Sequence, residues 1–192
     1  MPAHPGKLSI DPAFDTGRIL ERVKRGEYRV THVINTHGHA DHTAGNADIV
    51  RATGAALGIH YSDAQRLKGL LSSSLSRIFG GKGSPQPDLL LKDGDLVSFG
   101  KASLKVIHTP GHTPGGICLY AEGHLFTGDT LFVGGVGRTD LPGGSQKKLL
   151  TAIRDRIYTL PENTRIWPGH DYGSAPSSTV GREKSTNPYT RF

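Results

Sequence analysis

His37-Gly38-His39-Ala40-Asp41-His42 gathers three imidazoles and one carboxylate into six consecutive residues. The residues just before it, 30–35, are rich in β-branched side chains and predict a strand. Residues two apart in extended backbone point the same way, so His37 and His39 can bind one metal ion together. Asp41 and His42 follow as the chain turns toward a helix, and they can bind a neighbouring ion. The stretch predicts metal ligands in a loop at the end of a strand.

Three later segments supply further ligands of the same kinds. His112 lies in Gly111-His112-Thr113-Pro114-Gly115, Asp129 in Gly128-Asp129-Thr130, and His170 in Pro168-Gly169-His170-Asp171-Tyr172. A lone His-x-His pair is usually a surface feature without a metal role, whereas four such motifs in this order are specific for a metal site. Neutral imidazole and carboxylate together suit zinc, iron or manganese, and a hydrolytic site keeps a position open for water. The sequence therefore predicts a two-metal site with seven ligands: His37, His39, Asp41, His42, His112, Asp129 and His170.

These motifs, in this order, resemble the metallo-β-lactamase superfamily from about Ile10 to the last residues, and most closely its small single-domain glyoxalase-II-like branch. The resemblance implies an α/β fold, an αββα sandwich of two mixed β-sheets flanked by helices. It also implies two divalent metal ions, zinc or iron or both, with manganese as a further option. It assigns His37, His39 and His112 to the first ion; Asp41, His42 and His170 to the second; and Asp129 to both.

Asp129 also discriminates among branches of the family. Many true β-lactamases of this fold have a cysteine there, whereas aspartate is typical of the thioesterase-like and dioxygenase branches. The resemblance thus implies a hydroxyacylglutathione hydrolase-like enzyme, in which a metal-bound hydroxide attacks a glutathione thioester. In that reading Asp41 and Asp129 are catalytic, because they hold the metals of the hydroxide and can accept its hydrogen bond. The thiolate leaves readily, since a thiol has a pKa of about 8.5.

Two other functions stay open. A persulfide dioxygenase of the same family would hold a single iron through His37, His112 and Asp129, a triad of two histidines and one carboxylate with open positions. The other ligands persist in such enzymes without binding metal. A non-catalytic scaffold, which binds metal only to hold its loops, is a third hypothesis from another class.

The segment Gly134–Gly144 resembles the substrate loop of the glyoxalase-II-like hydrolases. Arg138 within it aligns with a basic residue that meets a glutathione carboxylate in relatives, and a guanidinium can hold both carboxylate oxygens. The alternative is an internal salt bridge between Arg138 and Asp140. Tyr172, two residues past His170, is a second candidate for the glutathione pocket.

Composition indicates one globular domain over residues 1–192, because a chain of 192 residues with 35% hydrophobic content can bury one core of ordinary size. The apolar runs are too short to span a bilayer, and the first residues lack the apolar stretch of a secretory signal. The single cysteine, Cys118, lies in an apolar strand and is expected in the core. These features predict a cytoplasmic protein that is not attached to a membrane.

The net charge of +6 would steer an anionic thiol substrate toward the protein. The basic residues are dispersed rather than clustered with aromatics, so no nucleic acid partner is expected. The expected partner is a small glutathione-linked thioester.

The order of elements predicts where the ligands lie. Apolar spacing predicts a helix over Thr16–Arg25 with Ile19, Leu20 and Val23 inward, and a helix from the cap Ser145 to Tyr158. Relative to the family, about two strands are missing before Ile10-Asp11-Pro12, which leaves a sheet edge uncovered. Either a homodimer that pairs this edge or an incorrectly assigned start codon is expected to explain it. Other expected elements are a helix over 44–51, an exposed loop over 71–88, and strands over 55–60, 96–99, 104–107, 117–120, 125–127 and 165–167.

Overall fold

The computed structural model describes residues 6–68 and 83–191. It divides into two compact units, one formed by residues 1–91 with 97–103 and the other by residues 92–96 with 104–192. Each unit has its own cluster of buried apolar side chains. The prediction of a single domain over the whole chain stays a prediction.

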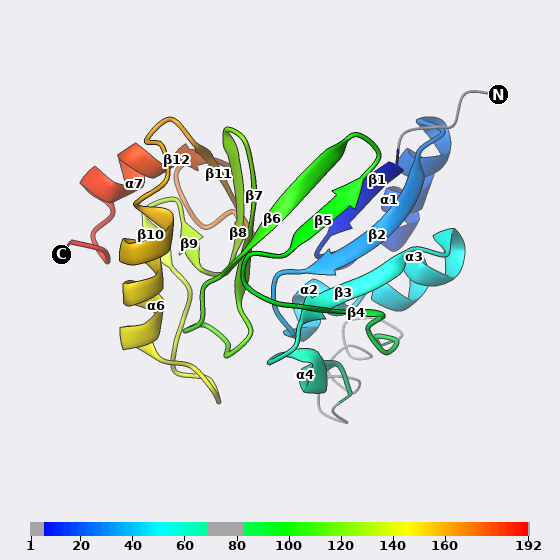
Figure 1. Cartoon of the computed structure of the whole chain (residues 1–192), viewed down its shortest axis with the longest axis horizontal. Coiled ribbons are helices and arrows are strands. Elements are labelled where there is room, and N and C mark those ends of the chain that lie inside the picture. Colours follow the sequence, from blue (N-terminus) through cyan, green and yellow to red (C-terminus); the bar gives the residue numbers. More distant parts are fainter. Residues whose placement is uncertain (1–5, 69–82, 192) are drawn as a thin grey trace. The chain divides into compact units, whose positions relative to one another are not determined.

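The first unit is built on a four-stranded sheet in the order β1-β2-β3-β4 (Figure 1). All its neighbouring strands are parallel, and parallel strands need crossover connections. The helices α1 and α3 lie in these connections. The elements are β1 Gly6–Ile10, α1 Thr16–Arg25, β2 Arg29–Asn35, α2 Ala40–Thr43, α3 Asn46–Thr53, β3 Ala56–His60, α4 Ala64–Lys68 and β4 Leu89–Leu91.

Helix α1 has the predicted boundaries, and its ends follow from local chemistry. Asp15 caps it by accepting a hydrogen bond from the backbone N–H of Arg18, and Gly26 follows its last turn. Ile19, Leu20 and Val23 pack on the cluster formed by β2, β3 and α3, as predicted, although they are only partly buried. Helix α3 begins two residues later than expected and buries Ile49 in the same cluster.

The second unit contains most of a six-stranded sheet in the order β12-β11-β8-β7-β6-β5, and a two-stranded sheet of β9 and β10. Strands β6, β7 and β8 are antiparallel to one another, whereas β8 and β11 are parallel neighbours. The elements are β5 Leu96–Phe99, β6 Ala102–His108, β7 Ile117–Ala121, β8 His124–Gly128, β9 Leu131–Phe132, β10 Gly135–Val136, α6 Gln146–Ala152, η1 Ile153–Ile157, β11 Arg165–Pro168, β12 Ser178–Thr179 and α7 Val180–Thr186.

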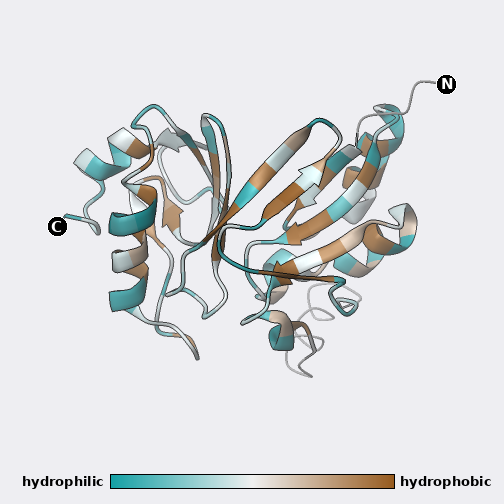
Figure 2. Cartoon of the chain, viewed as in Figure 1, coloured by the Kyte–Doolittle hydropathy of each residue, from teal (hydrophilic) through white to brown (hydrophobic). Residues whose placement is uncertain are grey.

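The helix expected over 145–158 is present, but its second half is wider than an α-helix. Ser145 caps α6 by accepting from the N–H of Lys148, and the π-helix η1 follows at once. Leu149, Ile153 and Ile157 are fully buried. They recur every four residues, a longer period than the 3.6 of an α-helix, so the wider turn keeps them on one face. Figure 2 shows hydrophilic and hydrophobic residues alternating along α6.

Strand β1 has a single neighbour, β2, in residues 6–68 and 83–191, so the expected sheet edge is present there. The homodimer inferred from that edge stays a prediction. Most of the loop expected over 71–88 lies outside the described residues. None of the helices described is long and apolar enough to cross a bilayer. The predicted cytoplasmic location is not tested by this.

Candidate metal centre

The ligands in the first unit follow strand β2 directly. His37 is buried in the turn after the strand, and His39 immediately precedes α2, which carries Asp41 and His42. The His37 ring centroid lies 4.8 Å from that of His39 and 4.2 Å from that of His42. Three imidazoles of the motif therefore lie close together within one short loop, and their binding of metal stays a prediction.

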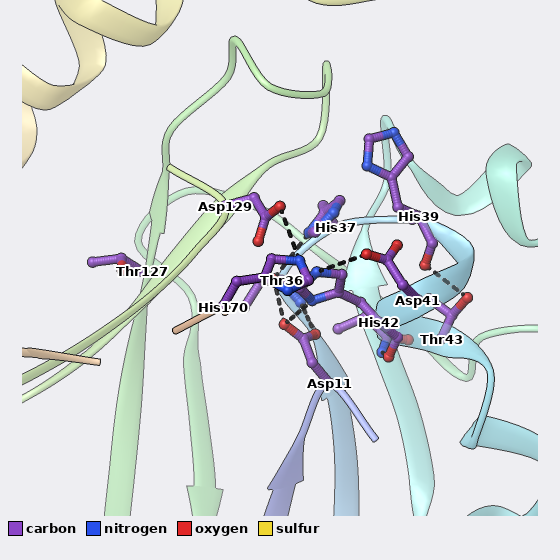
Figure 3. A network of polar contacts seen from close by, with 12 residues as sticks. Asp11, Thr36, His37, His39, Asp41, His42, Thr43, Thr127, Asp129 and His170 are labelled. Carbon is purple, nitrogen blue, oxygen red and sulfur yellow. Dashed lines mark hydrogen bonds and ion pairs between the residues drawn. The ribbon is translucent and has the colours of Figure 1, made fainter. Parts of the chain in front are cut away.

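Asp11, at the end of β1, holds this loop in place (Figure 3). One carboxylate oxygen accepts from the backbone N–H of Thr36 at 2.7 Å, and the other from its hydroxyl at 2.6 Å. The second oxygen also lies 3.0 Å from Nδ1 of His42. Since Nδ1 donates to this carboxylate, Nε2 of His42 keeps its lone pair for a metal. The donor atoms of Asp11, His37 and His42 all lie within 4.8 Å of one another.

Asp63 fixes the backbone between the first two histidines. This fully buried carboxylate accepts from the N–H of Gly38 at 2.9 Å and lies 3.5 Å from Nε of Arg66. A Cβ on Gly38 would lie 2.8 Å from the Cβ of Arg66, so only glycine fits without displacing the neighbouring helix. The loop geometry therefore depends on a close approach of two backbones as well as on the ligands.

The ligands in the second unit meet at one edge of its sheet. Asp129 follows β8 and His170 follows β11, and the carboxyl ends of parallel neighbours lie side by side. Oδ2 of Asp129 lies 3.5 Å from Nε2 of His170 and 3.6 Å from Nε2 of His112. One carboxylate oxygen thus faces both imidazoles, which is the arrangement expected of a bridging ligand.

The backbone near Arg138 orients His112. Nδ1 of His112 donates to the carbonyl of Arg138 at 2.7 Å, so Nε2 is the atom directed at Asp129. Gly137 allows this segment to run against the ligand, because a Cβ there would lie 1.8 Å from the carbonyl oxygen of Asp129. The glycine-rich loop is therefore part of the support of the centre.

A groove of about 410 Å³ is lined by Asp129, Arg138, Tyr172 and Tyr189, among other residues. The Tyr172 ring stacks on that of His170, with the centroids 4.8 Å apart and the planes 12° from parallel. The Arg138 guanidinium makes two hydrogen bonds to Asp140, of 2.8 and 2.6 Å. The internal salt bridge between Arg138 and Asp140, which was the alternative role for Arg138, is therefore present. The hydrogen bonds from Arg138 lower the pKa of Asp140 to about 2. Arg138 nevertheless borders the groove.

Sequence reasoning named the candidate ligands, whose metal binding stays a prediction, but it missed the residues that support them. Asp11 was noted only as part of the Ile10-Asp11-Pro12 landmark, and its place at a strand end was the available signal. Asp63 and the Arg138 carbonyl gave no signal, since each acts on a residue that is distant in sequence.

Cys118 is buried as predicted, and burial raises its pKa to about 11. At pH 8 only about one thiol in a thousand is then ionised, and the thiolate is the reactive form. We expect no labelling of the native protein by a thiol reagent within an hour, and one equivalent of labelling in urea. Rapid labelling of the native protein, followed by absorbance, would contradict the core position.

Comparison with known proteins identifies the family. The model of the metallo-β-lactamase superfamily matches residues 10–170. The human mitochondrial persulfide dioxygenase ETHE1 is 37% identical over 185 residues, which cover 93% of this chain and 64% of that protein. The hydroxyacylglutathione hydrolase of Nitrosococcus oceani is 37% identical over 169 residues, or 86% of this chain and 57% of the hydrolase. This chain therefore spans less than two thirds of either relative.

Solved structures agree. The crystal structure of the B3 metallo-β-lactamase BLEG-1 matches with a TM-score of 0.87 and 30% identity, covering 97% of this chain and 90% of that one. The protein TTHA1623, solved in a di-iron-bound form, matches with a TM-score of 0.79 and 34% identity, covering 94% and 87%. The predicted α/β fold is confirmed, and the chain belongs to the metallo-β-lactamase superfamily.

Proposed function

We propose that this chain is a metal-dependent hydrolase that cleaves a glutathione thioester. The observation that carries the proposal is the position of Asp129, whose Oδ2 lies 3.6 Å from Nε2 of His112 and 3.5 Å from Nε2 of His170. The resemblance assigns these two histidines to different ions. A carboxylate oxygen that faces both supports a site for two ions rather than one.

The side chains present fit divalent metals. Imidazoles and carboxylates suit zinc, iron and manganese, and the hydrogen bonds of His42 and His112 leave Nε2 of each ring available as a ligand. The family model spans the ligands of both units. When bound, two such ions lower the pKa of a shared water and polarise a carbonyl oxygen.

Residues of this chain would orient the attacking water and bind the glutathione part of the substrate, and most of them line the groove. Asp129 lines the groove, where its carboxylate can accept a hydrogen bond from the attacking water, and Asp41 is proposed to do the same from α2. Arg138 and the exposed ring of Tyr172 would bind the glutathione moiety along the groove. No general acid is needed for the leaving group, because a thiolate with a parent pKa of about 8.5 departs unaided.

A persulfide dioxygenase is the second candidate, and a specific observation favours it. The human persulfide dioxygenase is 37% identical to this chain, the same figure as for the Nitrosococcus hydrolase. In that case a single iron would be held by His37, His112 and Asp129. Against it we set the carboxylate of Asp129, whose Oδ2 faces both His112 and His170 and so suits two ions.

Separate assays of the two substrates distinguish these candidates. Protein loaded with zinc or with iron is given S-lactoylglutathione while thiol release is measured, and glutathione persulfide while oxygen uptake is measured. Thiol release from the thioester supports the hydrolase. Oxygen uptake with persulfide and no thioester cleavage overturns the hydrolase in favour of the dioxygenase. If neither substrate is turned over, the non-catalytic scaffold is the remaining hypothesis.

The role of Arg138 can be tested by mutation. Arg138→Ala is expected to raise the Michaelis constant for S-lactoylglutathione and to change turnover less, because binding would be lost equally from substrate and transition state. Arg154→Ala is a matched control, since Arg154 is likewise exposed and pairs with a neighbouring carboxylate, that of Asp155. An unchanged Michaelis constant in Arg138→Ala would leave Arg138 as the partner of Asp140 alone.

A further inference from the structure

One wall of the groove is the hairpin of β9 and β10. Two buried side chains hold it in place: Glu183 of α7 and Asn187, which directly follows that helix. Gly134 lies in the turn between β9 and β10, Gly135 is the first residue of β10, and both line the groove. The N–H of Gly134 donates to Oε2 of Glu183 at 2.8 Å. The side-chain amide of Asn187 donates to the carbonyl of Gly135 at 3.1 Å. Each of these two glycines is thus held through its backbone by one polar side chain.

Glu183 is an unusual residue for a helix buried against a turn. It is 1% exposed, and its Oε2 accepts a second hydrogen bond, of 2.9 Å, from Asn187. Among the ion pairs of residues 6–68 and 83–191, none involves Glu183. Burying a carboxylate is costly unless hydrogen bonds compensate it, and bonds to an ionised acceptor are stronger than neutral ones. An apolar side chain could fill the same space without the cost of burying a carboxylate. What Glu183 adds over an apolar residue is therefore its hydrogen bond to the turn.

Asn187 also positions a second part of the groove wall, at Tyr189. Asn187 is 1% exposed, and its side-chain oxygen accepts from the N–H of Tyr189 at 3.0 Å. Tyr189 lines the groove and is 63% exposed. Just beyond it, the Thr190 hydroxyl lies 2.6 Å from the hydroxyl of the buried Tyr158. Two groove walls that are far apart in sequence are therefore fixed by one buried cluster.

We propose that Glu183 and Asn187 are positioning residues that set the width of the groove beside Asp129 and thereby determine the affinity for the thiol-carrier part of the substrate. The inference rests on the proposed function, since it assigns the groove to that substrate. Neither residue touches the substrate or the metal ligands, and their effect passes through Gly134, Gly135 and Tyr189.

The test compares Glu183→Ala with Glu183→Gln, whose amide oxygen can still accept from Gly134. Glu162→Ala is the control, because Glu162 is an exposed carboxylate that pairs with Lys184 of the same helix and does not line the groove. With S-lactoylglutathione, and with glutathione persulfide in parallel, Glu183→Ala is expected to raise the Michaelis constant about tenfold. Turnover should stay within about twofold, and metal content should not change. Glu183→Gln should recover most of the loss.

Amide hydrogen exchange over residues 131–138 gives a readout that does not need activity. The Gly134 amide should exchange at least about tenfold faster in Glu183→Ala than in the wild type or Glu162→Ala. Unchanged exchange overturns the proposal. So does an unchanged Michaelis constant in an active enzyme, or a parallel loss of turnover and metal. If the wild type turns over neither substrate, the proposed function has failed, and the exchange result alone decides whether Glu183 holds the turn.

Discussion

Asp129→Ala is expected to lose both metal ions and all measurable activity, a larger loss than that of His170→Ala. Oδ2 of Asp129 faces the imidazoles of both His112 and His170, so its removal affects both ions, whereas His170→Ala removes one ligand of one ion. Substitution of residues that only support metal ligands commonly costs about 10- to 100-fold in affinity or activity. We therefore expect a loss of more than about 100-fold for Asp129 itself.

Elemental analysis of the purified variants checks this result. Asp155→Ala serves as the control, because Asp155 is an exposed carboxylate of the same unit that pairs with Arg154. Equal metal content in the wild type and Asp129→Ala would remove Asp129 from the site, and with it the observation on which the two-ion proposal depends.

Asp11→Ala is expected to have the second largest effect, on metal binding and on stability together. Without the carboxylate, Nδ1 of His42 has lost the acceptor that directs Nε2 to the metal, and the affinity of that ion should fall about 10- to 100-fold. The N–H of Thr36 also loses its acceptor, since it donates to Asp11 at 2.7 Å. An unsatisfied buried donor costs about 1–3 kcal/mol of the free energy of unfolding.

Chelator competition measures the first effect and urea unfolding of the metal-free protein the second. Asp11→Asn keeps one acceptor oxygen and should restore part of both. Glu21→Ala, an exposed substitution on α1, should change neither. If Asp11→Ala binds metal as tightly as the wild type, the orientation of His42 does not depend on Asp11.

The secondary structure was predictable where the apolar spacing is regular. The spacing of Ile19, Leu20 and Val23 fits an α-helix with one inward face, and the predicted bounds of α1 agree with the observed ones at both ends. The spacing of Leu149, Ile153 and Ile157 also predicted a helix, but the change from α6 to η1 was not predicted. Four-residue spacing is compatible with both helix types, and packing in the core selects between them.

The candidate ligands could be predicted from the sequence, whereas the residues that support them could not. His37 to His42 stand close together in sequence, so the motif itself carries the chemistry. Asp63 contacts Gly38 of the motif from 25 residues away, Asp11 contacts His42 from 31 residues away, and Glu183 contacts Gly134 from 49 residues away. A single acidic residue has no local pattern that reveals such a partner. Only the folded chain shows which of the acidic residues hold the ligands and the groove.

The number of metal ions per chain tests the central claim most directly. Protein purified without added metal is analysed for bound elements, and again after dialysis against zinc or iron and removal of the excess. The account predicts up to two ions per chain, zinc or iron or a mixture, because Oδ2 of Asp129 faces both His112 and His170, which are proposed to bind different ions. A single iron per chain, with the second site vacant even after metal is added, would contradict it and leave the persulfide dioxygenase.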